Sequence, residues 1–268
     1  MVITSLCLRR NMATGIRQLA ILGLVMALPA HSAKISVAST DFRTPVVELY
    51  TSEGCSSCPP ADRWISKLGD LLGDELHAVP LAFHVDYWNY LGWEDPFSDR
   101  KFTERQRALA AINRQRSIYT PEFLVSGAET RGTRAVVESI QAANQDKAEL
   151  RIGIAVDFVK GDGIVADLDI GGYPDDAVLY LAVYENNIVR EIGGGENHGR
   201  TLHHDFVVRD FRELSTSGKG DAIASAVIPL DAAWNTGELG LAAMVLDRKS
   251  NATLQAVSTP LGALFPGS

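Results

Sequence analysis

The chain has 268 residues, of which 46% are hydrophobic and 22% are charged, and its formal net charge at pH 7 is −8. The acidic balance and the lack of a long basic run argue against binding to nucleic acid or to anionic lipid. We therefore expect a globular protein that does not bind nucleic acid.

The first 33 residues have the pattern of a secretory signal peptide. Three arginines precede the uninterrupted apolar run 19–28, and small residues close the segment near Ala33. The apolar run is shorter than the roughly 20 residues that span a bilayer, which argues against the alternative of an uncleaved membrane anchor. We predict a periplasmic or secreted protein with a cleaved signal peptide at 1–33 and no stable membrane span afterwards. Cleavage removes Cys7 and changes the formal net charge to −11, because the segment holds three arginines and no acidic residue.

Between residues 34 and 148, short apolar runs alternate with segments of helical period. The predicted strands span 46–50, 78–85 and 122–126, and the predicted helices span 61–72, 99–116 and 133–143. Strands that alternate with helices are typical of an α/β layer with a mainly parallel sheet. We therefore expect one α/β domain over residues 34–148.

From residue 149 onward the apolar pattern changes to a period of two. Apolar residues alternate with polar or small ones over 152–158 and 164–170, on either side of a Gly-Asp-Gly turn. Further predicted strands span 178–184, 201–208, 222–228, 239–246 and 253–257. Short strands separated by Gly, Asp and Asn turns are typical of a β-sandwich. Residues 149–268 are predicted to form a second domain that is β-rich, mostly antiparallel and sandwich-like.

The strongest motif is Cys55-Ser56-Ser57-Cys58, which lies between a predicted strand and a predicted helix. Helix N-termini carry partial positive charge and free N–H donors, which favour a thiolate over a thiol. Two prolines follow Cys58 and place the helix start near Ser57, which we expect to be the N-cap. We predict that Cys55 is the exposed attacking residue and that Cys58 resolves the mixed disulfide. In an oxidising compartment the resting pair is expected to be a disulfide.

The order of strand, Cys-x-x-Cys and helix, followed by Thr120-Pro121 at the start of a later strand, resembles the thioredoxin-like superfamily over roughly residues 45–145. The resemblance implies an α/β thioredoxin-like domain over 34–148, with a helical insertion before Thr120. It implies a cis Thr120–Pro121 peptide bond facing the cysteine pair. It also implies that Tyr119, Thr120 and Pro121 bind extended substrate backbone. An ordinary trans proline that opens a strand is the alternative.

Side chains near the motif supply further candidate roles. Many members of the superfamily have a buried acid on the strand before the motif that accepts the proton of the second cysteine. Glu48 is the nearest match, one residue from the expected offset, and a carboxylate on the solvent face of the strand is the alternative. His84 and Asp86 end a predicted strand, where they either tune Cys55 or belong to the core. An aromatic cluster in the insertion either walls the cysteine site or caps the sheet, and we favour the cap. Its members are Tyr87, Trp88, Tyr90 and Trp93.

Three segments resemble more specifically an uncharacterised family of exported bacterial proteins with a thioredoxin-like domain. Their sequences are "SEGCSSCPPAD", "YTPEFLVSG" and "GENHGRTLHHDFVVR", and they extend across both predicted domains. The resemblance supports the predicted fold and the predicted export, and it implies no known reaction.

A glycine-rich segment of the second domain carries three histidines. Strand alternation places His203 and Asp205 on one face, where together with His198 they could gather a metal ion. No known metal spacing is matched, so we favour a glycine-rich hairpin with exposed polar histidines. His204 falls on the other face and is expected to be buried and hydrogen-bonded. We predict no metal site and no cofactor.

Together these patterns predict an exported thiol–disulfide oxidoreductase. Its partners would be protein or peptide thiols and disulfides, together with a redox partner that the sequence does not identify. One alternative is a protein that binds or delivers a soft metal such as copper, because thiolates suit soft ions. Another is a non-enzymatic binding protein on a thioredoxin-like scaffold. A disulfide across so short a loop contributes little entropic stability, which weakens that last alternative.

Overall fold

The computed structural model describes residues 1–2, 34–159, 161, 163–218 and 220–265. The chain separates into two units, Met1–His31 and Ser32–Ser268, and every described helix and strand belongs to the second unit. The predicted signal peptide lies outside the described residues, apart from its first two. In the described part of the chain, no helix has both the length and the apolar character needed to cross a membrane.

The described residues form fourteen strands, four α-helices and four single-turn 3-10 helices. The strands are β1 (Ile35–Ala38), β2 (Val46–Thr51), β3 (Val79–His84), β4 (Glu122–Val125), β5 (Ala128–Thr130), β6 (Arg151–Val159), β7 (Gly163–Tyr173), β8 (Ala177–Glu185), β9 (Ile188–Glu191), β10 (Thr201–His204), β11 (Val207–Leu214), β12 (Gly220–Ile228), β13 (Leu239–Asp247) and β14 (Thr253–Pro260). The helices are α1 (Pro59–Ile65), α2 (Leu68–Leu72), α3 (Arg100–Ile112), α4 (Thr133–Ala143), η1 (Asn89–Leu91), η2 (Gly195–Asn197), η3 (Thr236–Glu238) and η4 (Gly262–Leu264).

The strands assemble into three sheets. The largest has eight strands in the order β14-β13-β8-β11-β3-β2-β4-β5, a second has the order β1-β6-β7-β12, and β9 and β10 form a hairpin. In the eight-stranded sheet, β2–β3 and β3–β11 are parallel, and the other described neighbours pair antiparallel. The prediction of a mainly parallel sheet is therefore wrong, because β4 and β5 return antiparallel and strands from the C-terminal half extend the same sheet.

The predicted boundary between two domains at residue 148 is not observed. Strand β11 pairs directly with β3, with Val207 opposite Ala82, and the backbone N–H of Ala82 donates to the Phe206 carbonyl at 2.8 Å. Strand β1, from the N-terminal region, pairs with β6 of the second sheet. One hydrophobic cluster contains both Phe83 and Met244, so the two regions share a core. The change of period near residue 149 marks a change of element type within one compact unit.

The C-terminal half confirms the prediction of a β-rich region. In β7, alternate residues from Ile164 to Ile170 are buried, and they face a core that includes Leu181 of β8 and Leu241 of β13. The four-stranded sheet thus packs its apolar face on the β8–β13–β14 side of the large sheet. Each fully buried aliphatic side chain of this kind contributes about 1.5–3 kcal/mol of transfer free energy, so this core is a main source of stability.

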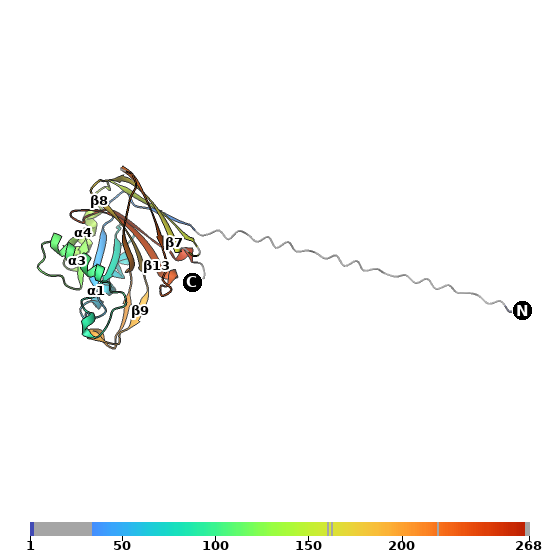
Figure 1. Ribbon diagram of the computed structural model, residues 1–268, viewed down its shortest axis with the longest axis horizontal. Helices are drawn as coiled ribbons and strands as arrows, with labels where there is room; N and C mark the ends of the chain where they lie inside the picture. Colours follow the sequence, from blue (N-terminus) through green and yellow to red (C-terminus); the bar gives the residue numbers. More distant parts are fainter. Residues whose placement is uncertain (3–33, 160, 162, 219, 266–268) are drawn as a thin grey trace. The chain divides into compact units, whose positions relative to one another are not determined.

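The four α-helices gather on the other side of the molecule, over the blue-to-green strands of Figure 1. Helices α1, α2 and α4 pack on one face of β2 around Leu49, and α3 packs on the opposite face around Phe83. All six residues of β2 are buried because both of its faces are covered. The helix predicted over 61–72 is divided into α1 and α2, whereas α4 has the predicted bounds.

Candidate functional site

The cysteine loop, residues 52–58, connects β2 to α1. Helix α1 begins at Pro59, and Cys58 is its N-cap with helical backbone angles. The two prolines occupy the first turn, where a missing N–H removes no intrahelical hydrogen bond. Cys55 and Cys58 form a disulfide with their Cα atoms 5.5 Å apart. Ser57 is therefore not the N-cap, and its Oγ lies 3.3 Å from Cys55 Sγ.

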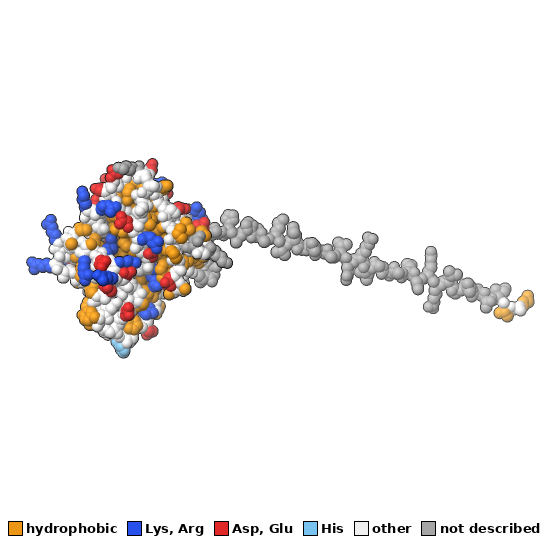
Figure 2. All heavy atoms as spheres, in the orientation of Figure 1, with side chains coloured by type: hydrophobic (Ala, Val, Ile, Leu, Met, Phe, Trp, Pro, Cys, Tyr) orange, Lys and Arg blue, Asp and Glu red, His pale blue; other side chains and the backbone are white. Residues whose placement is uncertain are grey.

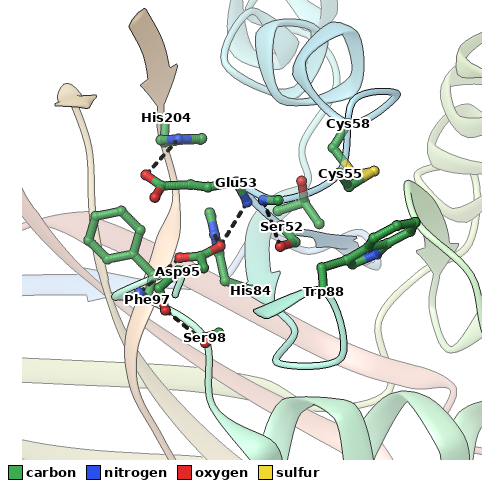
Figure 3. Close-up of polar contacts among 12 residues, drawn as sticks. Ser52, Glu53, Cys55, Cys58, His84, Trp88, Asp95, Phe97, Ser98 and His204 are labelled. Atoms are coloured by element: carbon green, nitrogen blue, oxygen red, sulfur yellow. Dashed lines mark hydrogen bonds and ion pairs between the residues drawn. A yellow bond between two sulfur atoms is a disulfide. The ribbon is translucent and has the colours of Figure 1, made fainter. Parts of the chain in front are cut away.

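Both cysteines are buried in this disulfide form. The exposed fraction is 1% for Cys55 and 0% for Cys58, whereas the two serines between them are exposed. Trp88 lies beside the disulfide in Figure 3, and a Cβ added at Gly54 would come within 3.1 Å of Trp88 Cβ. The prediction that Cys55 is solvent-exposed is wrong, because segments distant in the sequence pack over the loop.

Glu48 lies on the face of β2 opposite α1. Its carboxylate accepts two hydrogen bonds from the Arg105 guanidinium, Nη2 to Oε1 at 2.7 Å and Nε to Oε2 at 2.9 Å. It accepts a third from the Tyr50 hydroxyl at 2.7 Å. The pleat of β2 turns its odd-numbered residues toward α1 and Glu48 toward α3. Glu48 is therefore held in a buried ion pair and is not positioned to accept a proton from Cys58.

Asp62 is a buried acid that the sequence analysis did not single out. It lies on α1 four residues after Cys58, so the two residues occupy neighbouring positions on one helix face. Thr51 Oγ1 donates to Asp62 Oδ1 at 2.7 Å, and His204 Nδ1 lies 3.9 Å from Oδ2. Burial raises the pKa of the Asp62 carboxyl, and His204 acts in the opposite direction. In the sequence, an acid in a first helical turn has the ordinary explanation of a favourable dipole contact, so only its burial reveals it.

His84 is paired with Asp95 and not with Asp86. His84 Nδ1 lies 2.7 Å from Asp95 Oδ2, and both side chains are fully buried. The same oxygen accepts the backbone N–H of Glu53 at 2.8 Å, two residues before Cys55. Burial by itself lowers the pKa of His84, but the Asp95 carboxylate outweighs it and raises the pKa above its ordinary value. Asp86 instead accepts a hydrogen bond from α3.

Glu53 joins the His84–Asp95 pair to the β9–β10 hairpin. Its buried side chain points away from the disulfide and toward His204 (Figure 3). Glu53 Oε2 accepts a hydrogen bond from Trp93 Nε1 at 2.7 Å, and Oε1 lies 3.5 Å from both His204 Nε2 and Arg190 Nε. The His84 and His204 rings are 5.1 Å apart between centroids. Several buried atoms here have no hydrogen-bond partner among the described residues: Glu53 Oε1, His84 Nε2, Arg190 Nε and both ring nitrogens of His204.

The polar residues of the hairpin occupy the predicted faces but do not gather. In β10, Thr201 and His203 are exposed, and Leu202 and His204 are buried. The expected hydrogen bond of His204 is not found in the described structure, where longer ion-pair contacts take its place. Asp205 follows the end of β10 and accepts the backbone N–H of residue 187 at 2.8 Å. Across the described ranges, no group of three or more His, Cys, Asp or Glu side chains is arranged to hold a metal ion.

The Thr120–Pro121 peptide bond is cis, as expected. In the antiparallel pairing of β2 with β4, Tyr50 lies opposite Glu122, so Pro121 comes beside the end of β2 where the cysteine loop begins. Trp88 Nε1 donates to Thr120 Oγ1 at 2.7 Å and thereby links Thr120 to the wall of the cysteine loop. Beside them is an open cavity of about 390 Å³, lined by Tyr119, Pro121, Phe123, Thr130, Arg131 and Gly132.

Two of the four aromatic residues in the predicted insertion form walls of the cysteine loop. Trp88 packs against Gly54, and Trp93 hydrogen-bonds Glu53 and packs against the glycines of the hairpin. Tyr90 is 79% exposed. The preference for a cap over the sheet holds for Tyr87 and Trp88, which pack on the hydrophobic cluster around Phe83, but Trp88 also walls the cysteine loop, as Trp93 does. The sequence shows that aromatic residues cluster in this segment, but only the fold shows which of the rings face the cysteine loop.

Residues 46–246 match a family described as "Protein of unknown function (DUF1223)". The chain belongs to this family. No curated protein matches the chain. A protein of Agrobacterium tumefaciens, known from an X-ray crystal structure, is similar with 25% sequence identity and a TM-score of 0.61, covering 84% of this chain and 96% of that chain. HBP35 of Porphyromonas gingivalis is similar in fold, with 17% identity and a TM-score of 0.64, covering 83% of this chain and 76% of that chain.

Proposed function

We propose that this protein is an exported thiol–disulfide oxidoreductase that exchanges electrons with protein or peptide thiols through Cys55 and Cys58. The single observation that carries the proposal is the meeting of two elements at one edge of the sheet. The cysteine loop, with its Cys55–Cys58 disulfide, follows the C-terminal end of β2. Pro121 comes immediately before β4, which pairs antiparallel with β2, so the proline lies beside the start of the cysteine loop. On this proposal, β2, α1, β3, β4 and α4 are a thioredoxin-like arrangement embedded in a larger β-rich fold.

The proposed reaction balances over two thiol exchanges. A partner thiolate attacks Cys55 Sγ, the Cys55–Cys58 bond breaks, and Cys58 leaves as a thiolate that takes up a proton. The second partner thiolate then attacks the partner sulfur of the mixed disulfide, and Cys55 leaves and is protonated. The cysteine pair gains two electrons and two protons, and the partner dithiol becomes a disulfide. The reverse sequence reduces a partner disulfide.

Asp62 replaces Glu48 as the proposed proton carrier for Cys58. Its carboxyl is buried, its pKa is raised by burial, and it lies one helical turn from Cys58. A carboxyl with a raised pKa exchanges protons closer to neutral pH than an exposed aspartate does. We expect Asp62→Asn to lower the turnover of a peptide dithiol at pH 7 by about ten-fold or more, and less at alkaline pH where thiols ionise unaided. An Asp62→Asn rate that equals wild type across this pH range would contradict the role.

Tyr119, Thr120 and Pro121 remain the proposed substrate-binding residues. Tyr119 and Pro121 line the cavity of about 390 Å³ at the start of β4, which is large enough for one or two side chains of a bound peptide, and Thr120 lies between them in the chain. On the face drawn in Figure 2, acidic and basic side chains are interspersed, which suits peptide partners better than nucleic acid. We propose a periplasmic or secreted location from the composition of residues 1–33.

A second function is favoured by one observation, the burial of both cysteines. A disulfide with 1% and 0% exposure is what a non-enzymatic binding protein with a structural bond would also have. The two functions differ in the reduction potential of the pair. A structural bond has a potential below about −300 mV, whereas a redox-active one is reduced by glutathione or by stronger dithiols at less negative values.

Turnover of a peptide dithiol by the oxidised mature protein, with oxidised glutathione present to reoxidise the cysteine pair, tests the main proposal. We expect Cys55→Ser to abolish turnover. Cys58→Ser, given the peptide in its disulfide form, should accumulate a mixed disulfide, because the Cys55 thiolate displaces one peptide sulfur and no second protein thiol is left to resolve the bond. Ser225→Ala, on the exposed face of β12 in the four-stranded sheet, is the matched control and should leave turnover within about two-fold. A pair that stays oxidised in glutathione buffers below −300 mV, with no turnover, would establish the structural alternative.

A further inference from the structure

The loop between β9 and β10, residues 192–200, is bound directly to the cysteine loop. Asn197 is fully buried, and its Nδ2 donates to the carbonyl oxygens of Glu53 at 2.8 Å and of Cys55 at 2.9 Å. Both amide hydrogens of Asn197 are used in this way. The neighbouring Glu196 accepts the backbone N–H of Ser56 at 2.9 Å through Oε2. Three hydrogen bonds therefore join segments that lie about 140 residues apart in the sequence.

The glycines of the 192–200 loop allow this close approach. A Cβ added at Gly194 would lie 2.3 Å from the Gly92 carbonyl oxygen, and one at Gly195 would lie 3.7 Å from Gly54 Cα. Gly195 also has a φ of 68°, a region that L side chains rarely adopt. The loop is thus wedged between the Trp88–Trp93 segment and the cysteine loop. The glycine run is explained by this packing and not by a phosphate site.

We propose that the 192–200 loop is a gate over the Cys55–Cys58 pair, with Asn197 as the positioning residue that holds it closed. The inference rests on the proposed exchange function, because exchange requires a partner sulfur to reach Cys55 Sγ in line with the disulfide. Both cysteines are buried, and the loop is hydrogen-bonded to the backbone around Cys55, so on this proposal a protein-sized dithiol must displace the loop to reach that atom. A small dithiol needs a much smaller opening. The gate therefore selects partners that bind and displace the loop.

The charge of Glu196 in the gate also affects the reactivity of Cys55. The exposed Glu196 carboxylate is held at the N–H of Ser56, next to Cys55, and this hydrogen bond lowers the pKa of Glu196. A negative charge at this place disfavours a second one on Cys55 once the disulfide is opened. The closed gate thus keeps the Cys55 thiol less reactive than the open gate does.

The test compares two reductants on the oxidised mature protein. The rate of disulfide reduction is measured with dithiothreitol and with a reduced thioredoxin-class protein, by trapping free thiols with an alkylating agent. We expect Asn197→Ala to speed reduction by the protein dithiol about ten-fold, because two hydrogen bonds to the cysteine loop are lost, and to speed reduction by dithiothreitol three-fold at most. Asn235→Ala, which removes a side-chain cap of η3 in another loop, should change neither rate. Equal acceleration with both reductants, or no acceleration with the protein dithiol, would overturn the gate.

A milder variant covers the case in which Asn197→Ala fails to fold. Glu196 is at the surface, so Glu196→Gln keeps the shape of the loop and removes only the charge. We expect the Cys55 thiol of the reduced protein to alkylate about two- to three-fold faster at pH 7, with Glu191→Gln in β9 unchanged as the control. Unchanged alkylation in Glu196→Gln counts against the gate. These rates are measured without a natural substrate. If the protein shows no peptide turnover but Asn197→Ala still accelerates reduction by the protein dithiol selectively, the proposed function is contradicted and the gate is supported.

Discussion

The two halves of the eight-stranded sheet bury side chains of different kinds. Around β8 and β13 the interior is a continuous apolar core shared with the four-stranded sheet. Beyond the ends of β2 and β3 the interior is a cluster of acids and histidines, namely Glu53, Asp62, His84, Asp95 and His204. Most of the buried polar atoms without a described partner belong to this second region. A buried polar group without a hydrogen-bond partner lowers the stability of the fold. We therefore infer that the half around β8 and β13 stabilises the protein, and that the polar cluster beyond β2 and β3 serves the function of the site.

The largest effect is expected when the buried ion pair between Glu48 and Arg105, on the polar half of the sheet, is broken. We expect Arg105→Met to lower the free energy of unfolding by about 3–5 kcal/mol, because the Glu48 carboxylate is left buried without its partner. Guanidinium-induced unfolding, followed by circular dichroism, measures the change. The matched control is Arg100→Met on the same helix, whose exposed pair with Glu104 is worth no more than about 0.5 kcal/mol.

The same variant also tests the placement of Glu48. We expect the reduction rate of the disulfide in Arg105→Met to equal that of wild type at temperatures where the variant is folded, because Glu48 faces away from α1. A variant with normal stability and altered thiol reactivity would return Glu48 to the role that the sequence predicts.

The apolar half responds to loss of volume. We expect Leu241→Ala on β13 to lower the free energy of unfolding by about 2–5 kcal/mol, since its fully buried side chain lies between the two sheets. Ile223→Ala on β12, whose side chain is 62% exposed, should change stability by less than about 1 kcal/mol. Equal losses in the two variants would show that the outer face of the four-stranded sheet is not a free surface.

The smallest expected effect is a pH dependence from the His84–Asp95 pair. Asp95 raises the pKa of His84 above 6.5, so the contribution of this pair to stability is complete below pH 6.5 and is lost as the pH rises through the folded-state pKa. The pKa of Asp95 is lowered from 3.8, so its contribution is present above pH 3.8 and is lost in stronger acid. We expect the unfolding free energy of wild type to fall between pH 6 and pH 9 more than that of His84→Gln. His203→Gln, which changes an exposed histidine, should keep the slope of wild type.

Patterns of local period predicted most of the elements. The alternation in β7 and the helical face of α4 appear in the structure as the sequence indicates, because each reports burial of its own segment. The position of Pro121 at the start of β4 was also predictable. Pairing between distant strands was not, since nothing local to Ala82 specifies Val207 as its neighbour. The two-domain interpretation failed for this reason.

The site was predicted less completely than the fold. The cysteine pair stands out as a motif, but Asp62 and Glu53 have ordinary explanations as exposed acids in a helix start and a loop. Their burial follows from the β9–β10 hairpin, which packs His204 and Asn197 against them from far along the chain. The choice of Glu48 failed because strand alternation places it on the face away from the cysteines. Neither the burial of Asp62 and Glu53 nor the orientation of Glu48 is visible in a local sequence motif.

The parallel pairing of β3 with β11 has a consequence for biosynthesis. Until residue 214 has been made, β3 has no neighbour on one side, and its free N–H and C=O groups are a template for pairing with other chains. A nascent chain that ends near residue 148 therefore carries an open sheet edge in the middle of the future protein. Closure joins residues more than 120 positions apart, which slows folding. For the proposed export, slow closure of this edge would leave the chain unfolded while it crosses the membrane.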